Sequence, residues 1–170
     1  MNKQNKRYLV ASIIVVVLAV VVNAFIIAQS CLNGMRSTES SSLVVNLLKG
    51  IINGIKSDTI NEGNIDTFTH IVRKLVGHFG LFVFSGIFTS WSLYLWVHFR
   101  SWYNHYKGLF ITLIFGLSLA ALTELIQLTV PNRSGQISDV FIDFAGYIVG
   151  TGIIVLAVFI INKKRNKNPA

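Results

Sequence analysis

The chain alternates between long apolar runs and short polar connections. Four runs, at residues 8–28, 75–97, 108–130 and 140–161, each approach or exceed the roughly 20 residues that a helix needs to cross a bilayer core. They predict an all-α integral membrane protein, a four-transmembrane-helix bundle built as a single domain over residues 1–170. The long connection between the first two runs, residues 29–74, is expected to be an extracellular loop.

The first run has a second interpretation, as a cleaved signal peptide. It follows a basic start and ends in Ala28-Gln29-Ser30-Cys31, which faintly resembles a lipoprotein cleavage site. The run is closer to a full span than to the apolar core of a signal peptide, which has about 7 to 15 residues. Retaining it also gives the even number of spans that basic segments at both termini require, so we expect a transmembrane helix.

Within the long connection, apolar and polar residues alternate with the period of a helix. The apolar positions are Val44, Leu47, Leu48, Ile51, Ile52 and Ile55. This spacing predicts a short amphipathic helix over residues 43–55, either on the outer leaflet or as a cover packed on the other helices. Ser41 or Ser42 is expected to cap its start. Residues 57–69 are expected to form a solvated loop that leads into the second span.

The few charges are distributed unevenly. Of the 170 residues, 13% are charged, and the formal net charge is +8. Nine of the 15 basic residues, and no acid, fall near the two termini and in the connection that carries Arg100 and Lys107. Because Lys and Arg accumulate in cytoplasmic segments, both termini and this connection are expected on the cytoplasmic side. The positive balance is therefore a topology signal, and no nucleic acid partner is expected. The single cysteine, Cys31, excludes an internal disulfide framework.

Polar side chains inside the spans gather near their expected outer ends. Ionisable groups within a membrane are costly enough to be candidate functional residues. The candidate ligand-binding residues are Lys74, His78, Glu124, Gln127, Arg133, Asp139 and Asp143. Since the second and fourth spans begin where the third ends, these residues are expected to converge at one level.

Two of these acids form a like-charged pair. Asp139 and Asp143 lie about one turn apart on the fourth span, where they repel each other. Arg133, Arg73 or Lys74 is expected to neutralise them.

Small and amide side chains indicate close packing between the spans. Gly146 and Gly150 form a GxxxG pair, which lets another helix approach closely. Asn23, in the first span, is expected to hydrogen-bond into the bundle.

Three interpretations of the polar cluster stay open. The first is a structural network that holds the bundle together, the second a binding site for a polar headgroup or peptide-like ligand, and the third a catalytic or metal site. His78 and the three carboxylates offer donors for a divalent ion, and His78 alone offers a general base. The chain has no HExxH, GxSxG or glycine-rich phosphate motif. Catalytic residues therefore stay unknown, no metal or cofactor is predicted, and enzyme activity is left open.

Residues 74–79 read Lys-Leu-Val-Gly-His-Phe, a basic residue and then a histidine at the start of a span, and residues 123–127 read Thr-Glu-Leu-Ile-Gln. Further along the chain follow Arg133, Asp139, Gly146 and Gly150. In residue type and spacing, these positions resemble the VanZ-like family of bacterial membrane proteins, named for a member associated with teicoplanin resistance. The family usually has Asn four residues after the Asp, where this chain has Asp143.

The resemblance implies a multi-pass protein of the bacterial cell membrane with a part in low susceptibility to teicoplanin-type glycopeptide antibiotics. Such lipoglycopeptides carry an acyl tail and act at the outer leaflet, so the implied partners are membrane lipids, a peptidoglycan precursor or the drug. The alternatives are a membrane-bound hydrolase or transferase acting on a lipid headgroup, a structural or assembly subunit, and, less favoured, a small transporter. The oligomeric state is left open.

Overall fold

The computed structural model describes residues 3–98 and 105–167, and every regular element in this part of the chain is a helix. Within these described residues, four helical runs are long and apolar enough to cross a membrane, which confirms the predicted all-α transmembrane bundle. Arg100, in the connection expected on the cytoplasmic side, lies outside the described residues. The helices are α1 (Lys3–Ser30), α2 (Gly34–Ile55), α3 (Ile65–Val72), η1 (Arg73–Gly80), α4 (Leu81–His98), α5 (His105–Thr129) and α6 (Ile137–Lys167).

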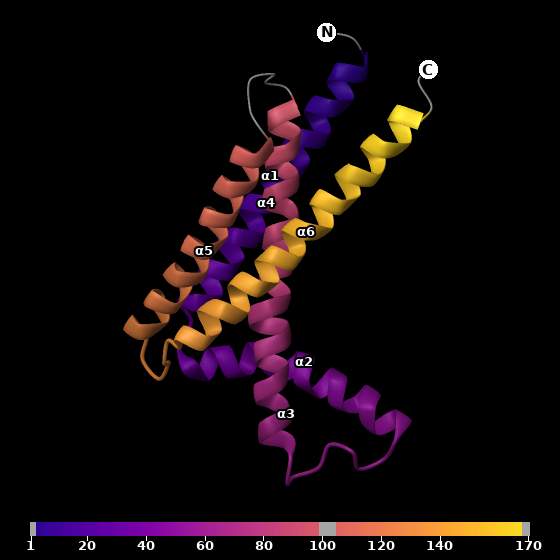
Figure 1. The fold of residues 1–170 in the computed structure, drawn as a ribbon. Helices are drawn as coiled ribbons and strands as arrows, with labels where there is room; N and C mark the ends of the chain where they lie inside the picture. Colours follow the sequence, from indigo (N-terminus) through magenta and orange to yellow (C-terminus); the bar gives the residue numbers. More distant parts are fainter. Residues whose placement is uncertain (1–2, 99–104, 168–170) are drawn as a thin grey trace.

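The helices α1, α4, α5 and α6 form an up-and-down bundle (Figure 1). The start of α1, the end of α6 and the facing ends of α4 and α5 lie together at one end of it. The α5–α6 connection, α2 and α3 lie at the other end, which we call the distal end. Segments rich in Lys and Arg therefore share one end of the bundle, as a positive-inside topology requires.

The second span belongs to a helix much longer than predicted. α3, η1 and α4 follow one another from Ile65 to His98, with helical dihedral angles at both junctions. At about 1.5 Å per residue this run is roughly 50 Å long, against about 30 Å for a bilayer core. Its first turns project past the bundle at the distal end (Figure 1). The loop predicted over residues 57–69 is wrong from Ile65 onward, because apolar residues recur there at helical spacing and Asp66 favours the first turn.

α2 lies crosswise at the distal end of the bundle (Figure 1). It begins at Gly34, earlier than predicted, so Ser41 and Ser42 lie within the helix and neither caps it. The Ser42 hydroxyl donates to the Glu39 carbonyl oxygen at 2.7 Å. Such a local bond satisfies the hydroxyl of a serine inside a helix.

One face of α2 is apolar and exposed. Val45 is buried, whereas Leu43, Leu47, Ile51 and Ile55 are 76%, 62%, 54% and 84% exposed. Their spacing of four residues puts these four side chains on one side of the helix. An apolar face of this kind beside a membrane-spanning bundle favours a position on the leaflet over a cover packed on the other helices.

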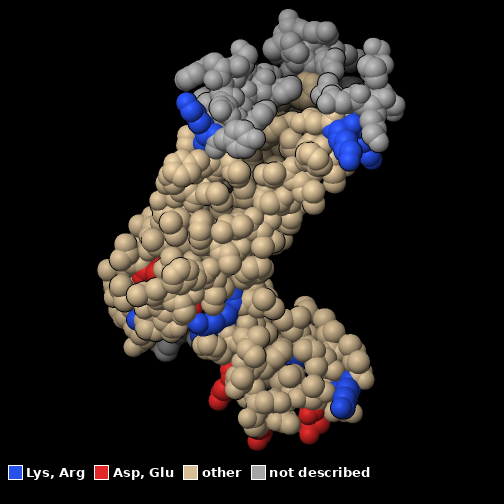
Figure 2. Space-filling model, in the orientation of Figure 1, with Lys and Arg blue, Asp and Glu red and all other residues tan. Residues whose placement is uncertain are grey.

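Charged side chains lie towards the two ends of the molecule, with an uncharged belt between them (Figure 2). In this view Lys and Arg appear at both ends, whereas Asp and Glu appear only towards the distal end. The belt has the composition of a surface that faces lipid, as the hydropathy of the four spans requires.

Glycines allow α6 to pack against η1 and α4 with the backbones almost in contact. Gly146 faces the Phe79 carbonyl oxygen, and Gly150 faces the Val83 carbonyl oxygen. Gly86, on α4, makes a similar approach to the backbone of α6. A Cβ atom at any of these positions would overlap backbone atoms, so small residues set the distance between these helices.

We expect Gly150→Ala to destabilise the bundle by about 1–3 kcal/mol, because the added methyl group would force the backbones of α4 and α6 apart. Thermal unfolding of the detergent-purified protein measures this effect. Gly152→Ala is the matched control on the same helix, since no described atom lies within 4 Å of the added Cβ. Equal midpoints for Gly150→Ala and the unaltered protein would contradict close packing at this contact.

Candidate functional site

The structure brings all seven predicted site residues together at the distal end. They are supplied by η1 (Lys74, His78), α5 (Glu124, Gln127), the α5–α6 connection (Arg133) and the first turns of α6 (Asp139, Asp143). Glu124, Gln127, Asp139 and Asp143 are buried, although their polar groups belong to helices that face lipid elsewhere. We call this group of seven residues the distal cluster.

The basic residues of the second span lie on an unusual stretch of backbone. η1 is a π-helix, a conformation that is rare and frequently occurs at functional sites. Its last residue, Gly80, fits this wider turn closely, because an added Cβ would lie 3.3 Å from the Leu75 carbonyl oxygen. Arg73, Lys74 and His78 all belong to η1, so the irregular backbone determines where these three basic groups point.

Lys74 and Asp139 form the shortest ion pair of the distal cluster. Lys74 Nζ lies 2.6 Å from Asp139 Oδ1 and donates a longer bond, 3.4 Å, to Gln136 Oε1. The Ser138 hydroxyl donates to the same Asp139 oxygen at 3.2 Å. Lys74 therefore neutralises Asp139, and the alternative partner Arg133 contacts α1 instead.

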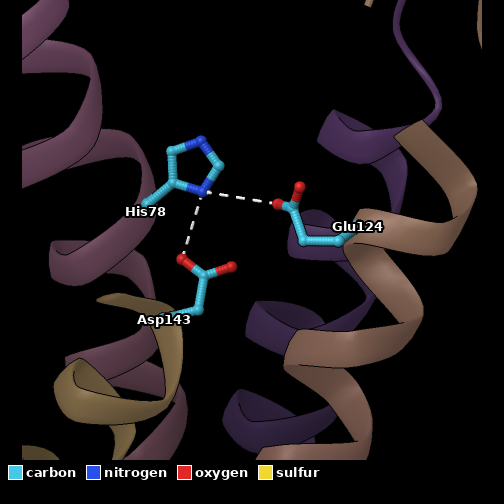
Figure 3. A group of neighbouring side chains, drawn as sticks. All are labelled: His78, Glu124 and Asp143. Carbon is cyan, nitrogen blue, oxygen red and sulfur yellow. Dashed lines mark hydrogen bonds and ion pairs between the residues drawn. The ribbon is translucent and has the colours of Figure 1, made fainter. Parts of the chain in front are cut away.

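His78 lies at the centre of the distal cluster, and the carboxylates of Glu124 and Asp143 lie near the same nitrogen of its ring (Figure 3). Its Nδ1 atom is 3.1 Å from Asp143 Oδ1 and 3.8 Å from Glu124 Oε1. Its Nε2 atom is 3.8 Å from Asp139 Oδ2. The departure from the VanZ-like pattern at Asp143 thus puts a carboxylate against an imidazole, which can carry the compensating positive charge.

Glu124 ties the end of α5 to the start of α6. Glu124 Oε2 accepts a hydrogen bond from the Gln136 backbone amide at 2.8 Å, and Oε1 accepts one from Gln127 Nε2 at 3.2 Å. Gln136 was not among the predicted site residues, although it contacts both Glu124 and Lys74. Its contacts arise from the path of the turn, and no periodicity in the sequence indicates that path.

Arg133 links the α5–α6 connection to the end of α1. Arg133 Nη1 donates to the Gln29 carbonyl oxygen at 2.8 Å and, more weakly, to those of Ser30 and Leu32 at 3.4 Å. A cation suits this place because the carbonyl groups at a helix end carry partial negative charge. Burial, and secondly the nearby positive charge of Arg73, lower the pKa of the Arg133 guanidinium. Two guanidinium groups close enough to repel each other form a potential anion site.

Two cavities of different character meet at the distal cluster. A polar cavity of about 560 Å³ is lined by His70, Arg73, Lys74, His78, Gln127, Asn132, Arg133, Ser134, Gln136 and Asp139. A mainly apolar cavity of about 300 Å³ lies between α1, α2 and the long helix, lined by residues that include Phe25, Ile26, Val44, Val72, Val76, Gly77, Leu81 and Phe82. Arg73, His78, Gln127 and Arg133 line both cavities. The site thus offers neighbouring surfaces to a charged group and to a hydrocarbon chain.

Deeper in the bundle, polar side chains pair with one another. Asn23 Nδ2 donates to Thr89 Oγ1 at 3.2 Å, and the Ser85 hydroxyl donates to Asn23 Oδ1 at 2.6 Å. Asn23 therefore hydrogen-bonds into the bundle as expected, joining α1 to α4. These bonds stabilise helix packing and lie outside the residues that line the two cavities.

We expect Lys74→Met and Asp139→Asn each to lower the thermal midpoint, because each removes one partner of a largely buried ion pair. The double variant should lose less than the two single losses added together, with a coupling of about 1–3 kcal/mol. Thermal unfolding of the four proteins in detergent measures that coupling. Lys74→Met combined with Asp66→Asn is the control, since Asp66 is exposed and additivity is expected there. Strict additivity for Lys74 and Asp139 would show that their contact does not stabilise the fold.

Comparison with known proteins identifies a matching protein family. The model of the family described as VanZ/LLP1 matches residues 8–159. No curated protein and no solved structure matches the chain. The match covers the first three apolar runs, most of the fourth and every residue of the distal cluster. The chain therefore belongs to the VanZ/LLP1 family.

Proposed function

We propose that the distal end faces the outside of a bacterial cell, and that the distal cluster binds the headgroup of an anionic envelope lipid. The main support is that a polar cavity and an apolar cavity meet and share lining residues, among them Arg73 and His78. A ligand with a charged head and a hydrocarbon tail matches that pair of surfaces. Both volumes reach the range of about 300–1,000 Å³ that is typical of small-molecule sites.

The charges around the polar cavity favour an anionic headgroup. Arg73, Lys74 and Arg133 line it, and Asp139 is the one carboxylate among its described lining residues. Asp139 is already paired with Lys74 at 2.6 Å, so the guanidinium groups of Arg73 and Arg133 give the lining of this cavity an excess of positive charge. Arginine binds phosphate and carboxylate groups through paired N–H donors, which suits a phospholipid or a lipid-linked precursor.

The resemblance to a family named for a member associated with teicoplanin resistance supports a link between this site and antibiotic susceptibility. Teicoplanin-type drugs and lipid-linked peptidoglycan precursors both combine a polar head with a hydrocarbon chain. A protein that binds either one at the outer leaflet can change how much drug reaches its target. We therefore propose a role in low susceptibility to teicoplanin through the distal cluster.

An enzyme acting on a lipid headgroup is the second candidate. His78 contacts Asp143 at 3.1 Å and faces the polar cavity, the arrangement of a general base held by a carboxylate. A hydrolase or transferase would turn over a lipid extract and lose that turnover in His78→Gln. A binding protein would retain the lipid unchanged, so analysis of the lipid after incubation separates the two functions.

We expect the purified protein to retain phosphatidylglycerol, an anionic lipid, more strongly than phosphatidylcholine through a detergent wash. Gly77→Leu should reduce retention roughly tenfold, about 1.4 kcal/mol, because the new side chain would occupy the apolar cavity. No described atom lies within 4 Å of a Cβ at Gly77, so the change should not strain the fold. Gly54→Leu is the control, equally free of contacts and outside the lining of both cavities. Native mass spectrometry counts the bound lipid, and equal retention by both variants would contradict the proposed tail site.

We expect expression in a teicoplanin-sensitive host to raise the inhibitory concentration of the drug. Arg73→Gln should lose most of this increase, because it removes a guanidinium from the polar cavity. Lys56→Gln removes the same charge from an exposed position that lines neither cavity, and it should keep the increase. Membrane abundance is measured for each variant. Full protection by Arg73→Gln at normal abundance would argue against the site.

A further inference from the structure

Three metal-ligating side chains converge at the centre of the distal cluster from three different helices. They are His78 on η1, Glu124 on α5 and Asp143 on α6 (Figure 3). Each offers one donor atom, and these atoms all lie within 4.8 Å of one another. We propose that His78, Glu124 and Asp143 bind a divalent first-row transition metal ion. This inference concerns the ion alone and does not depend on the proposed lipid.

The distances suit a shared ion after small movements. Metal bonds of about 2.0–2.2 Å to nitrogen and oxygen put neighbouring donors roughly 3–3.5 Å apart. The distance from His78 Nδ1 to Asp143 Oδ1 is 3.1 Å, within that range. The distance from the same nitrogen to Glu124 Oε1 is 3.8 Å, a few tenths of an ångström longer. All three donor atoms lie within 4.8 Å of one another, so changes in side-chain torsions can bring them around one ion.

A buried oxygen without a partner provides the second observation. Asp143 Oδ2 has no hydrogen-bond partner among the described residues, and the side chain is only 1% exposed. Leaving such an oxygen unpaired costs about 1–3 kcal/mol, and more when the group is charged. In Figure 3 the Asp143 carboxylate points toward the space between His78 and Glu124. An ion in that space would satisfy both carboxylates together.

The surrounding contacts hold the donors as the outer shell of a metal site does. His78 Nε2 faces Asp139 Oδ2 at 3.8 Å, and Asp139 is itself fixed by Lys74. A carboxylate behind the second ring nitrogen favours a proton on Nε2 and leaves Nδ1 free to ligate. The Gln136 backbone amide holds Glu124 Oε2 at 2.8 Å. Two of the three ligands, His78 and Glu124, thus have neighbours that orient them before any ion arrives.

The donor set and its charge indicate the class of ion. One imidazole and two carboxylates, without a thiol, suit Zn²⁺, Mn²⁺ or Fe²⁺, since imidazole favours first-row transition metals over Mg²⁺ and Ca²⁺. Two carboxylates balance the charge of a divalent cation, so the occupied site would be neutral within the low dielectric of the bundle. His78 lines both cavities, which places an ion there beside any ligand that occupies them.

Metal titration of the chelator-treated, tag-free protein tests the proposal. We expect about one Zn²⁺ or Mn²⁺ per chain, counted by elemental analysis and by the loss of the free Mn²⁺ electron paramagnetic resonance signal. A rise in thermal midpoint should accompany binding, because an ion that binds the folded state stabilises it. Glu124→Gln and Asp143→Asn, which keep the side-chain shape, should each weaken binding at least tenfold. Asp66→Asn, an exposed acid also at the distal end, should leave binding unchanged.

X-ray absorption of the Zn²⁺-loaded unaltered protein gives a measurement that does not depend on how the variants fold. One nitrogen ligand with oxygen ligands supports the site. The proposal would be overturned if the shell contained oxygen alone, or if no metal stayed bound after incubation with a 100-fold excess and gel filtration. Equal metal affinity in all folded variants would also overturn it. Because no lipid enters these measurements, their failure would leave the proposed headgroup site standing, and the loss of lipid retention would leave the metal site standing.

Discussion

The distal cluster depends on local neutralisation of charge, because its carboxylates are buried. A charged group near the core of a bilayer is tolerated only when a partner of opposite charge or a set of hydrogen bonds lies within reach. Lys74 meets Asp139 at 2.6 Å, and His78 meets Asp143 at 3.1 Å. These two contacts each join η1 to α6, so the register between the two helices is fixed by charge as well as by packing.

Helix packing and charge pairing support each other at this contact. Gly146 allows the Phe79 backbone to approach α6 closely. Phe79 directly follows His78, and Gly146 lies about one turn after Asp143, so this contact is next to the charge pair. A larger side chain at Gly146 would separate the helices and pull the imidazole from its carboxylate partner. The π-helical turn of η1 contributes to the same alignment, because it changes the angle between successive side chains just where His78 must face α6. The glycines and the irregular turn therefore act as positioning features for the polar groups.

The sequence predicts the composition of the cluster better than its contacts. Four apolar runs and the distribution of Lys and Arg are enough to predict four spans and to bring the seven residues to one end. Pairing depends on the rotation of one helix against another, and periodicity within a helix carries no information about that rotation. This is why Arg133, Arg73 and Lys74 were all candidates to neutralise Asp139 and Asp143, and why Gln136 was missed. The π-helical turn and the early start of α2 also have no counterpart in the apolar pattern.

Charge balance links the proposed ion to the proposed headgroup. Arg73, Lys74 and Arg133 supply three positive charges at the distal cluster, and Glu124, Asp139 and Asp143 supply three carboxylates. With a neutral His78 and every carboxylate ionised, these charges sum to zero, and attraction for an anion rests on the local placement of the guanidinium groups alone. A divalent cation at His78, Glu124 and Asp143 would change that sum to a net positive charge beside the polar cavity. The same carboxylates that would hold the ion are the ones that otherwise offset the arginines, so an occupied metal site would strengthen the binding of an anionic headgroup without any change in the residues that touch it.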